Sequence, residues 1–175
     1  DPPNVPKDDN PVGSYKKDFT LPNDWENMNV ILHFGGVSSA FYLWVNGKEV
    51  GYSEDSRLPA EFTITEYLKK GKNKIAVQVF RWSDGSYLAD QDHWRMSGIQ
   101  REVFIMAEPK LRIQDFFYQT KLDKNYQDAV FQLRPKVENL TGVNIKNYTF
   151  EAQFFDANNQ PLFKEPLPQP VIDML

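Results

Sequence analysis

Apolar and polar residues alternate along most of the chain with the period of two that is typical of β-strands. The alternating segments are short and rich in Val, Ile, Phe and Tyr, and Gly, Asn, Asp and Pro separate them. No stretch shows a sustained helical period, so the pattern predicts an all-β protein. Strands are expected at residues 13–21, 28–34, 40–45, 48–52, 61–65, 74–80 and 102–106.

Two glycine-containing turns are the clearest local signals between these strands. Asn46-Gly47 lies between two apolar segments, and both residues tolerate the positive φ that a two-residue hairpin turn requires. Residues 66–70 are expected to form one helical turn that Gly71 ends in the left-handed conformation.

The pattern changes at Glu108-Pro109-Lys110, which predicts a domain boundary. Residues 1–11 hold four prolines and are expected to be an extended linker. Residues 12–108 hold about seven strands, which suits an antiparallel sandwich. Residues 109–175 hold three longer strand candidates, at 111–122, 129–138 and 146–156, and a weak one at 161–165. A seven-stranded sandwich needs about 100 residues, so we expect the second domain to be truncated.

Composition excludes several classes of protein. The net charge of −4 argues against a nucleic-acid partner or an anionic membrane surface. No apolar run approaches the roughly 20 residues that a membrane-spanning helix needs. The chain has no cysteine, which excludes disulfides and zinc–thiolate sites within it.

The segment between the last two strands of the first domain concentrates the candidate chemistry. It contains Asp84, Asp90, Asp92 and His93 together with several aromatic residues. It is much longer than the two to six residues of an ordinary connection. Because disordered segments are poor in aromatic residues, we expect an ordered, packed loop that carries a site.

The aromatic and basic residues of this region have two possible roles. Trp82, Tyr87 and Trp94 are expected to pin the loop to the sandwich, and stacking on sugar rings is the alternative. Arg57 and Arg95 have carboxylates close in sequence and are expected to form bidentate pairs that hold loops. Neither histidine has the neighbours of a zinc site.

Three stretches resemble a known family. They are NPVGSY at 10–15, GVSSAFYLWVNGKEVGYSEDSRLPAEF at 36–62 and RWSDGSYLADQDHWRMSGIQREV at 81–103. They resemble the N-terminal sugar-binding domain of family 2 glycoside hydrolases, and the WSDGSYL…DQD.WR.SGI pattern is similar to that of the large bacterial β-galactosidases. The resemblance implies a jelly-roll, galactose-binding-like β-sandwich followed by a partial immunoglobulin-like β-sandwich.

In that family a TIM barrel with two catalytic glutamates follows these domains. The resemblance therefore implies a fragment with no catalytic residue of its own, which supplies one wall of the active site and braces the barrel. It implies a β-galactoside substrate and a homo-oligomeric parent enzyme. A bacterial cytoplasm and a periplasm both remain open as its location.

The resemblance also implies ligand roles for three carboxylates. The second aspartate of the DQD run contacts galactose and a sodium ion in the family, and that position is Asp92 here. Asp84 and Glu54 match positions that can bind a structural magnesium ion with further ligands from a preceding segment. Sodium and magnesium are thus expected cofactors of the full enzyme, and the fragment by itself is expected to require neither.

Three other interpretations stay open. The fragment itself could be an enzyme that uses Asp90 and Asp92. In an extended segment these two residues would share a face at roughly 6.5 Å, near the 5–5.5 Å that separates the two carboxyl groups of a retaining glycosidase. Asp92 and Asp84 could instead be turn residues. As a whole, the chain could be a free-standing carbohydrate-binding module or a purely structural interaction domain.

Overall fold

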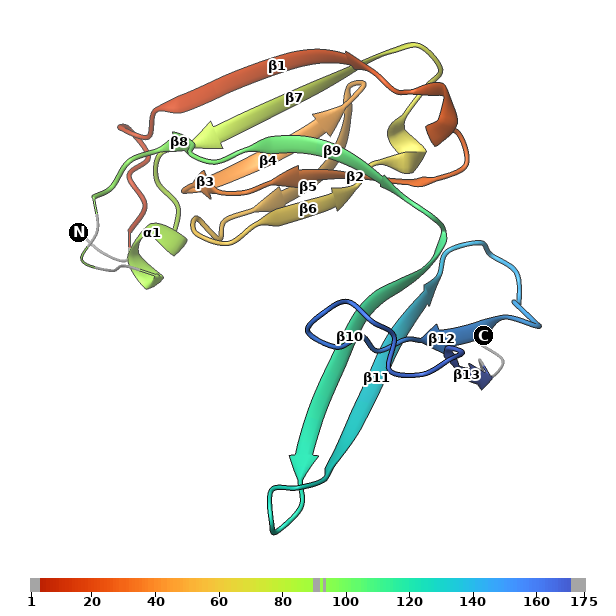
Figure 1. Cartoon of the computed structure of the whole chain (residues 1–175). Coiled ribbons are helices and arrows are strands. Elements are labelled where there is room, and N and C mark those ends of the chain that lie inside the picture. The colour runs from red at the N-terminus through yellow and green to blue at the C-terminus, as the bar shows by residue number, and fades with distance from the viewer. Residues whose placement is uncertain (1–3, 90–91, 93, 171–175) are drawn as a thin grey trace. The chain divides into compact units, whose positions relative to one another are not determined.

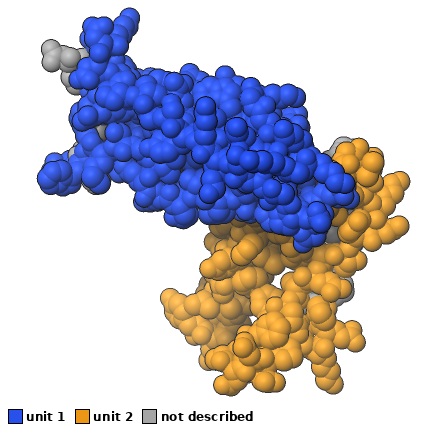
Figure 2. Space-filling model, turned by 90° about the horizontal axis from the view of Figure 1, so that it is seen from above, with its two compact units in different colours: residues 1–109 blue, residues 110–175 orange. Residues whose placement is uncertain are grey.

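The computed structural model describes residues 4–89, 92 and 94–170 (Figure 1). Strands make up nearly all of the regular structure there, which confirms the all-β prediction. The helical elements in the described part are one four-residue helix, α1 (Gly85–Leu88), and two 3-10 turns, η1 (Asn23–Trp25) and η2 (Thr65–Tyr67). The chain divides into two compact units, Asp1–Pro109 and Lys110–Leu175 (Figure 2).

Two antiparallel sheets form the first unit and face each other across one core (Figure 1). The four-stranded sheet has the order β1-β7-β4-β5, and the three-stranded sheet has the order β6-β2-β9. Their bounds are β1 Val12–Thr20, β2 Asn29–Phe34, β4 Ala40–Val45, β5 Lys48–Ser53, β6 Ala60–Thr63, β7 Lys72–Phe80 and β9 Val103–Glu108. A two-residue pairing joins β3 (Val37–Ser38) to β8 (Gly98–Ile99).

The core follows from the period of two along the central strands. Alternate residues of β2, β4 and β7 point inward, so that each strand contributes three buried apolar side chains to one cluster. They are Val30, Leu32, Phe34, Phe41, Leu43, Val45, Ile75, Val77 and Val79. The rings of Phe34 and Phe41 lie 4.8 Å apart, centroid to centroid. Gly51 is required here because a Cβ atom at this position would lie 2.7 Å from the Phe62 ring.

The Asn-Gly turn between β4 and β5 is confirmed, with φ of 51° at Asn46 and 82° at Gly47. The helical turn predicted at 66–70 lies earlier in the chain. The 3-10 turn η2 ends at Tyr67, and Leu68 is already extended. Gly71 has the predicted positive φ of 83°, but it forms the approach to β7.

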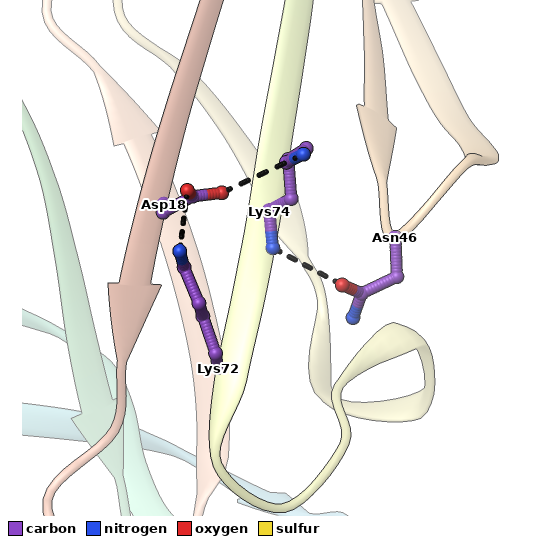
Figure 3. A network of polar contacts seen from close by, with 4 residues as sticks. All are labelled: Asp18, Asn46, Lys72 and Lys74. Atoms are coloured by element: carbon purple, nitrogen blue, oxygen red, sulfur yellow. Dashed lines mark hydrogen bonds and ion pairs between the residues drawn. The ribbon is translucent and has the colours of Figure 1, made fainter.

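Asp18 on the edge strand β1 forms ion pairs with two lysines of the neighbouring strand β7 (Figure 3). Its carboxylate lies 2.9 Å from Lys72 Nζ and 3.9 Å from Lys74 Nζ, both on β7. The backbone N–H of Lys74 in turn donates to Asn46 Oδ1 from the hairpin turn. The contacts join β1, β7 and the end of β4 on the exposed side of the sheet.

The second unit is built around one long hairpin, β10 (Leu111–Leu122) with β11 (Ala129–Asn139). The strand predicted at 146–156 is shorter, β12 (Thr149–Ala152), and it pairs with β13 (Leu167–Pro170). The weak strand predicted at 161–165 is wrong, since only an isolated bridge forms there, between Phe155 and Pro161.

None of the helical elements in the described residues has the length and apolar character needed to cross a membrane.

Candidate functional site

The connection between β7 and β9 is fixed at its start by the segment that precedes β1. The backbone N–H of Trp82 donates to Asn10 Oδ1, and Asn10 Nδ2 donates to the carbonyl of Trp82, both at 2.9 Å. The N–H of Arg81 also donates to the Pro11 carbonyl at 3.0 Å. The end of the predicted linker is therefore part of the candidate site. Asn10 was not predicted as a site residue, because no local pattern shows that it faces a strand end 72 residues away.

Helix α1 (Gly85–Leu88) comes directly after this clamped segment and is only four residues long. Asp84 caps it, with Oδ1 accepting from the N–H of Gly85 at 3.0 Å, and the N–H of Ser83 donates to Ser86 Oγ at 3.1 Å. A Cβ atom on Gly85 would lie only 3.2 Å from the carbonyl oxygen of Glu54. Glycine thus allows α1 to approach the loop after β5.

The aromatic residues of the loop separate into two groups. Trp82 and Tyr87 are half-buried and stack at 6.4 Å with nearly parallel rings. The guanidinium of Arg95 lies 5.8 Å from the Trp82 ring centroid and 5.9 Å from that of Tyr87. These three side chains pack against one another within the loop. Trp94 does not, since it is 88% exposed.

Asp92 lies on a bend of this loop and is exposed, so solvent and ligands can reach its carboxylate. Asp90 and His93 fall outside the described residues, and the pairing of Asp90 with Asp92 considered above falls there too.

The other predicted pair of carboxylates, Glu54 and Asp84, lies near the hydroxyl of Tyr52. Tyr52 Oη donates to Glu54 Oε2 at 2.6 Å. Burial raises the pKa of Tyr52 far above its ordinary value, and the hydrogen bond to Glu54 and the nearby charge of Asp84 raise it further. The structure therefore brings Glu54 and Asp84 to the same tyrosine, although 30 residues separate them in the sequence.

This pair is not a complete metal site. Across residues 4–89, 92 and 94–170, no group of three or more His, Asp or Glu side chains could hold a metal ion. One oxygen of Glu54 is already engaged by Tyr52. The His33 side chain makes contacts of its own away from this pair: Nδ1 lies 2.9 Å from Glu61 Oε1, and the ring stacks on that of Phe104.

A pocket of about 90 Å³ lies between this loop, β3 and the loop after β5. It is lined by Ser38, Ser39, Asp55, Ser56, Arg57, Arg81, Trp82, Gly85, Ser86, Ala89, Arg95, Met96 and Ser97. The side-chain hydrogen bond that the structure gives for Arg57 is to an amide, since its Nη1 donates to Gln100 Oε1 at 3.2 Å, and the carboxylate pair expected for Arg57 stays a prediction. The pocket was not predictable from local sequence patterns, because its walls come from three separate parts of the chain.

Residues 1–109 match the family described as glycosyl hydrolases family 2, sugar binding domain. The chain therefore belongs to the family 2 glycosyl hydrolases, and its first unit is their sugar-binding domain.

Curated β-galactosidases are among the relatives to which the chain is similar. It is 47% identical to that of Priestia megaterium over 167 residues and 52% identical to that of Leuconostoc mesenteroides over 165 residues. These alignments cover 95% and 93% of this chain but only 16% and 15% of the relatives. The chain thus spans about a sixth of their length.

Solved structures support the fold. Bacteroides uniformis β-glucuronidase 2, covalently bound to cyclophellitol-6-carboxylate aziridine, aligns with a TM-score of 0.75 at 22% identity, over 93% of this chain and 20% of that one. A β-glucuronidase from Ruminococcus gnavus aligns with a TM-score of 0.71 at 21% identity, over 90% of this chain and 28% of that one.

Proposed function

We propose that this chain is the sugar-binding and bracing part of a β-galactosidase, an enzyme that hydrolyses terminal β-D-galactose from β-galactosides. The observation that carries the proposal is its identity of 45–53% with β-galactosidases over 78–95% of its length. In this proposal a TIM barrel elsewhere in the enzyme holds the two catalytic glutamates, and the second unit begins an immunoglobulin-like sandwich that leads to it. The parent enzyme is a homo-oligomer.

Asp92 is the residue we propose to contact the substrate. Its carboxylate is exposed on a loop whose base is fixed by Asn10 and by the stack of Trp82, Tyr87 and Arg95. A carboxylate accepts hydrogen bonds from sugar hydroxyls and also binds hard cations through oxygen. Asp92 would therefore hold one galactosyl hydroxyl and contribute to a sodium site.

Magnesium is proposed for the carboxylates of Glu54 and Asp84. Oxygen ligands suit this ion, which usually takes one or two carboxylates and keeps several waters. This pair supplies at most two carboxylate ligands, so further ligands must come from other residues or from water. The ion would neutralise two negative charges that lie beside the hydroxyl of Tyr52.

The test of the proposed function is Asp92→Ala in the full-length parent enzyme. A hydrogen bond to a charged group contributes about 1.5–3 kcal/mol, so we expect kcat/KM to fall by roughly one to two powers of ten. The melting temperature should not change, because Asp92 is exposed and outside the core. Asp92→Asn keeps one acceptor oxygen but loses the charge, so it should weaken sodium activation more than hydroxyl binding.

Asp24→Ala is the matched control, since Asp24 is an exposed aspartate of another turn of the same unit. The proposed magnesium site has a separate test, in which the melting temperature is measured as magnesium is added to the parent enzyme and to its Glu54→Gln variant. If both Asp92 variants keep the kcat/KM and sodium dependence of the parent and lower only its melting temperature, Asp92 is a turn residue and the proposal fails.

A free-standing carbohydrate-binding module is the alternative function. Such a module would bind galactosides with this chain alone, whereas the proposed wall needs the barrel to complete its site. Isothermal titration of the chain with a β-galactoside separates the two, and we expect neither binding nor hydrolysis.

A further inference from the structure

We propose that Asn46-Gly47, the turn between β4 and β5, is a site of spontaneous deamidation that the folded first unit keeps closed. An asparagine side chain reacts most readily with its own backbone when glycine follows, because glycine has no Cβ to hinder the attack and leaves the backbone free to turn. This dipeptide occurs once in the chain. The turn has no part in the proposed function.

The reaction needs no reagent other than water. The backbone nitrogen of Gly47 attacks the side-chain carbonyl carbon Cγ of Asn46. The bond from Cγ to Nδ2 breaks, the proton of the attacking nitrogen goes to the leaving group, and ammonia departs from a five-membered succinimide ring. Water then opens the ring at either of its carbonyls. One product is aspartate, and the other is isoaspartate, in which the main chain runs through the former side chain.

In the folded unit the Asn46 side chain is held by hydrogen bonds to two other segments. Nδ2 donates to the Tyr67 carbonyl at 2.9 Å and to Asn73 Oδ1 at 2.7 Å. Oδ1 accepts from the backbone N–H of Lys74 at 3.1 Å, so that the side chain points toward β7 (Figure 3). Attack by Gly47 requires the side chain to fold back over its own backbone, and these bonds must break first.

The backbone of the turn adds a second restraint. Asn46 and Gly47 have φ of 51° and 82°, as a two-residue hairpin turn requires. The N–H of Asn46 donates to the Lys74 carbonyl at 2.8 Å. The amide of Asn73 is only 1% exposed, so water does not compete for it. Ring closure therefore waits for the hairpin to open, and its rate follows the population of the opened form.

The product does not fit the place that the amide leaves. An aspartate carboxylate has acceptors only, and the Tyr67 carbonyl and Asn73 Oδ1 are acceptors as well. An isoaspartate lengthens the main chain of a two-residue turn by one carbon. Because setting an acceptor against an acceptor in place of a hydrogen bond is costly, a unit that has opened and reacted does not regain its native stability. Chemical modification of the opened form thus makes opening irreversible.

The experiment incubates the chain at neutral pH in native buffer and, in parallel, in enough guanidinium chloride to unfold it. Mass spectrometry of proteolytic peptides follows the gain in mass when the amide NH₂ of Asn46 is replaced by OH. In the denatured chain we expect Asn46 to convert faster than Asn125 and Asn139, which precede Tyr and Leu. In native buffer the conversion of Asn46 should be at least about tenfold slower than in the denatured chain.

Variants of the turn separate the effect of the fold from that of the sequence. Asn73→Ala removes one acceptor of Asn46 Nδ2 and should raise the rate in native buffer at least about threefold. Asn125→Ala, in the other unit, is the control and should leave that rate unchanged. Both variants should keep the rate of the parent chain in guanidinium chloride. Asn46→Asp copies one product and should unfold at a lower guanidinium chloride concentration than the parent chain, whereas Asn125→Asp should not.

The proposal is overturned by any of three results. Equal rates at Asn46 in native buffer and in guanidinium chloride would show that the fold does not close the site. Conversion at Asn46 no faster than at Asn125 in the denatured chain would show that the turn is not a reactive site. An Asn46→Asp variant as stable as the parent chain would show that the product fits.

Discussion

At the scale of single residues, the clearest structural device is the amide of Asn73. This side chain is 1% exposed and makes four hydrogen bonds. Its Oδ1 accepts from the Lys69 N–H and from Asn46 Nδ2, and its Nδ2 donates to the carbonyls of Lys69 and Gly71. One amide thus fixes the turn before β7 and joins it to the β4–β5 hairpin.

Asn73→Ala should lower the free energy of unfolding of the first unit by about 2–3 kcal/mol, because it leaves buried backbone groups without partners. All four tryptophans, Trp25, Trp44, Trp82 and Trp94, belong to this unit. Urea unfolding followed by tryptophan fluorescence therefore measures the change. Asn125→Ala, in the turn between β10 and β11, is the control and should have no effect on this transition. A loss below about 0.5 kcal/mol would show that water replaces the amide.

At the scale of elements, β1 is attached to β7 by charge as well as by the backbone ladder. The hydrogen bond from Lys72 and the charges of Lys72 and Lys74 hold the pKa of Asp18 below its ordinary value of 3.8 (Figure 3). A lowered pKa in the folded state means that the unfolded state binds the proton more readily. The contribution of Asp18 is therefore present above the unfolded pKa and is lost as the pH falls through the folded pKa.

We expect Asp18→Asn to lower the urea midpoint of the first unit slightly at pH 7 and to have no effect at an acidic pH below the folded pKa of Asp18, where the carboxylate is protonated in both states. The effect should shrink in 1 M salt, because the pairs are exposed and screened. Asp24→Asn is the control, because Asp24 lies in η1 outside the sheet. The assignment is wrong if Asp18→Asn shifts the midpoint equally at both pH values.

At the scale of the whole molecule, the two units differ in how much apolar surface they enclose. The first unit has a continuous core between two sheets. In the second, the hairpin β10–β11 exposes large apolar side chains on both faces. They include Ile113, Phe116, Phe117, Tyr118, Leu122 and Val130. Unpaired strand edges next to such surface recruit other strands.

We therefore expect the backbone amides of β10 and β11 to exchange hydrogen faster than those of β2, β4 and β7, or to gain protection as the protein concentration rises. Hydrogen exchange at two concentrations, with sedimentation measured in parallel, decides this. Equal protection of both units in a dilute monomer would contradict the expectation.

Much of the first unit was predictable because its determinants are local. The period of two in segments such as 74–80 depends only on which face of a strand is buried, and β7 confirms it with buried Ile75, Val77 and Val79. The turn at Asn46-Gly47 depends on the φ preferences of two residues, and the structure confirms it. The family was also recognisable from sequence, because the WSDGSYL…DQD.WR.SGI pattern is continuous along the chain.

Only the tertiary structure decided how separate parts of the chain meet. The clamp of Asn10 on Trp82 joins residues 72 positions apart, and Glu54 and Asp84 reach Tyr52 through the approach of Gly85. No local preference specifies such contacts, because they depend on which strand ends the sheets bring together. The pocket that Arg57, Arg81 and Arg95 help to line has the same origin, because its walls come from separate parts of the chain.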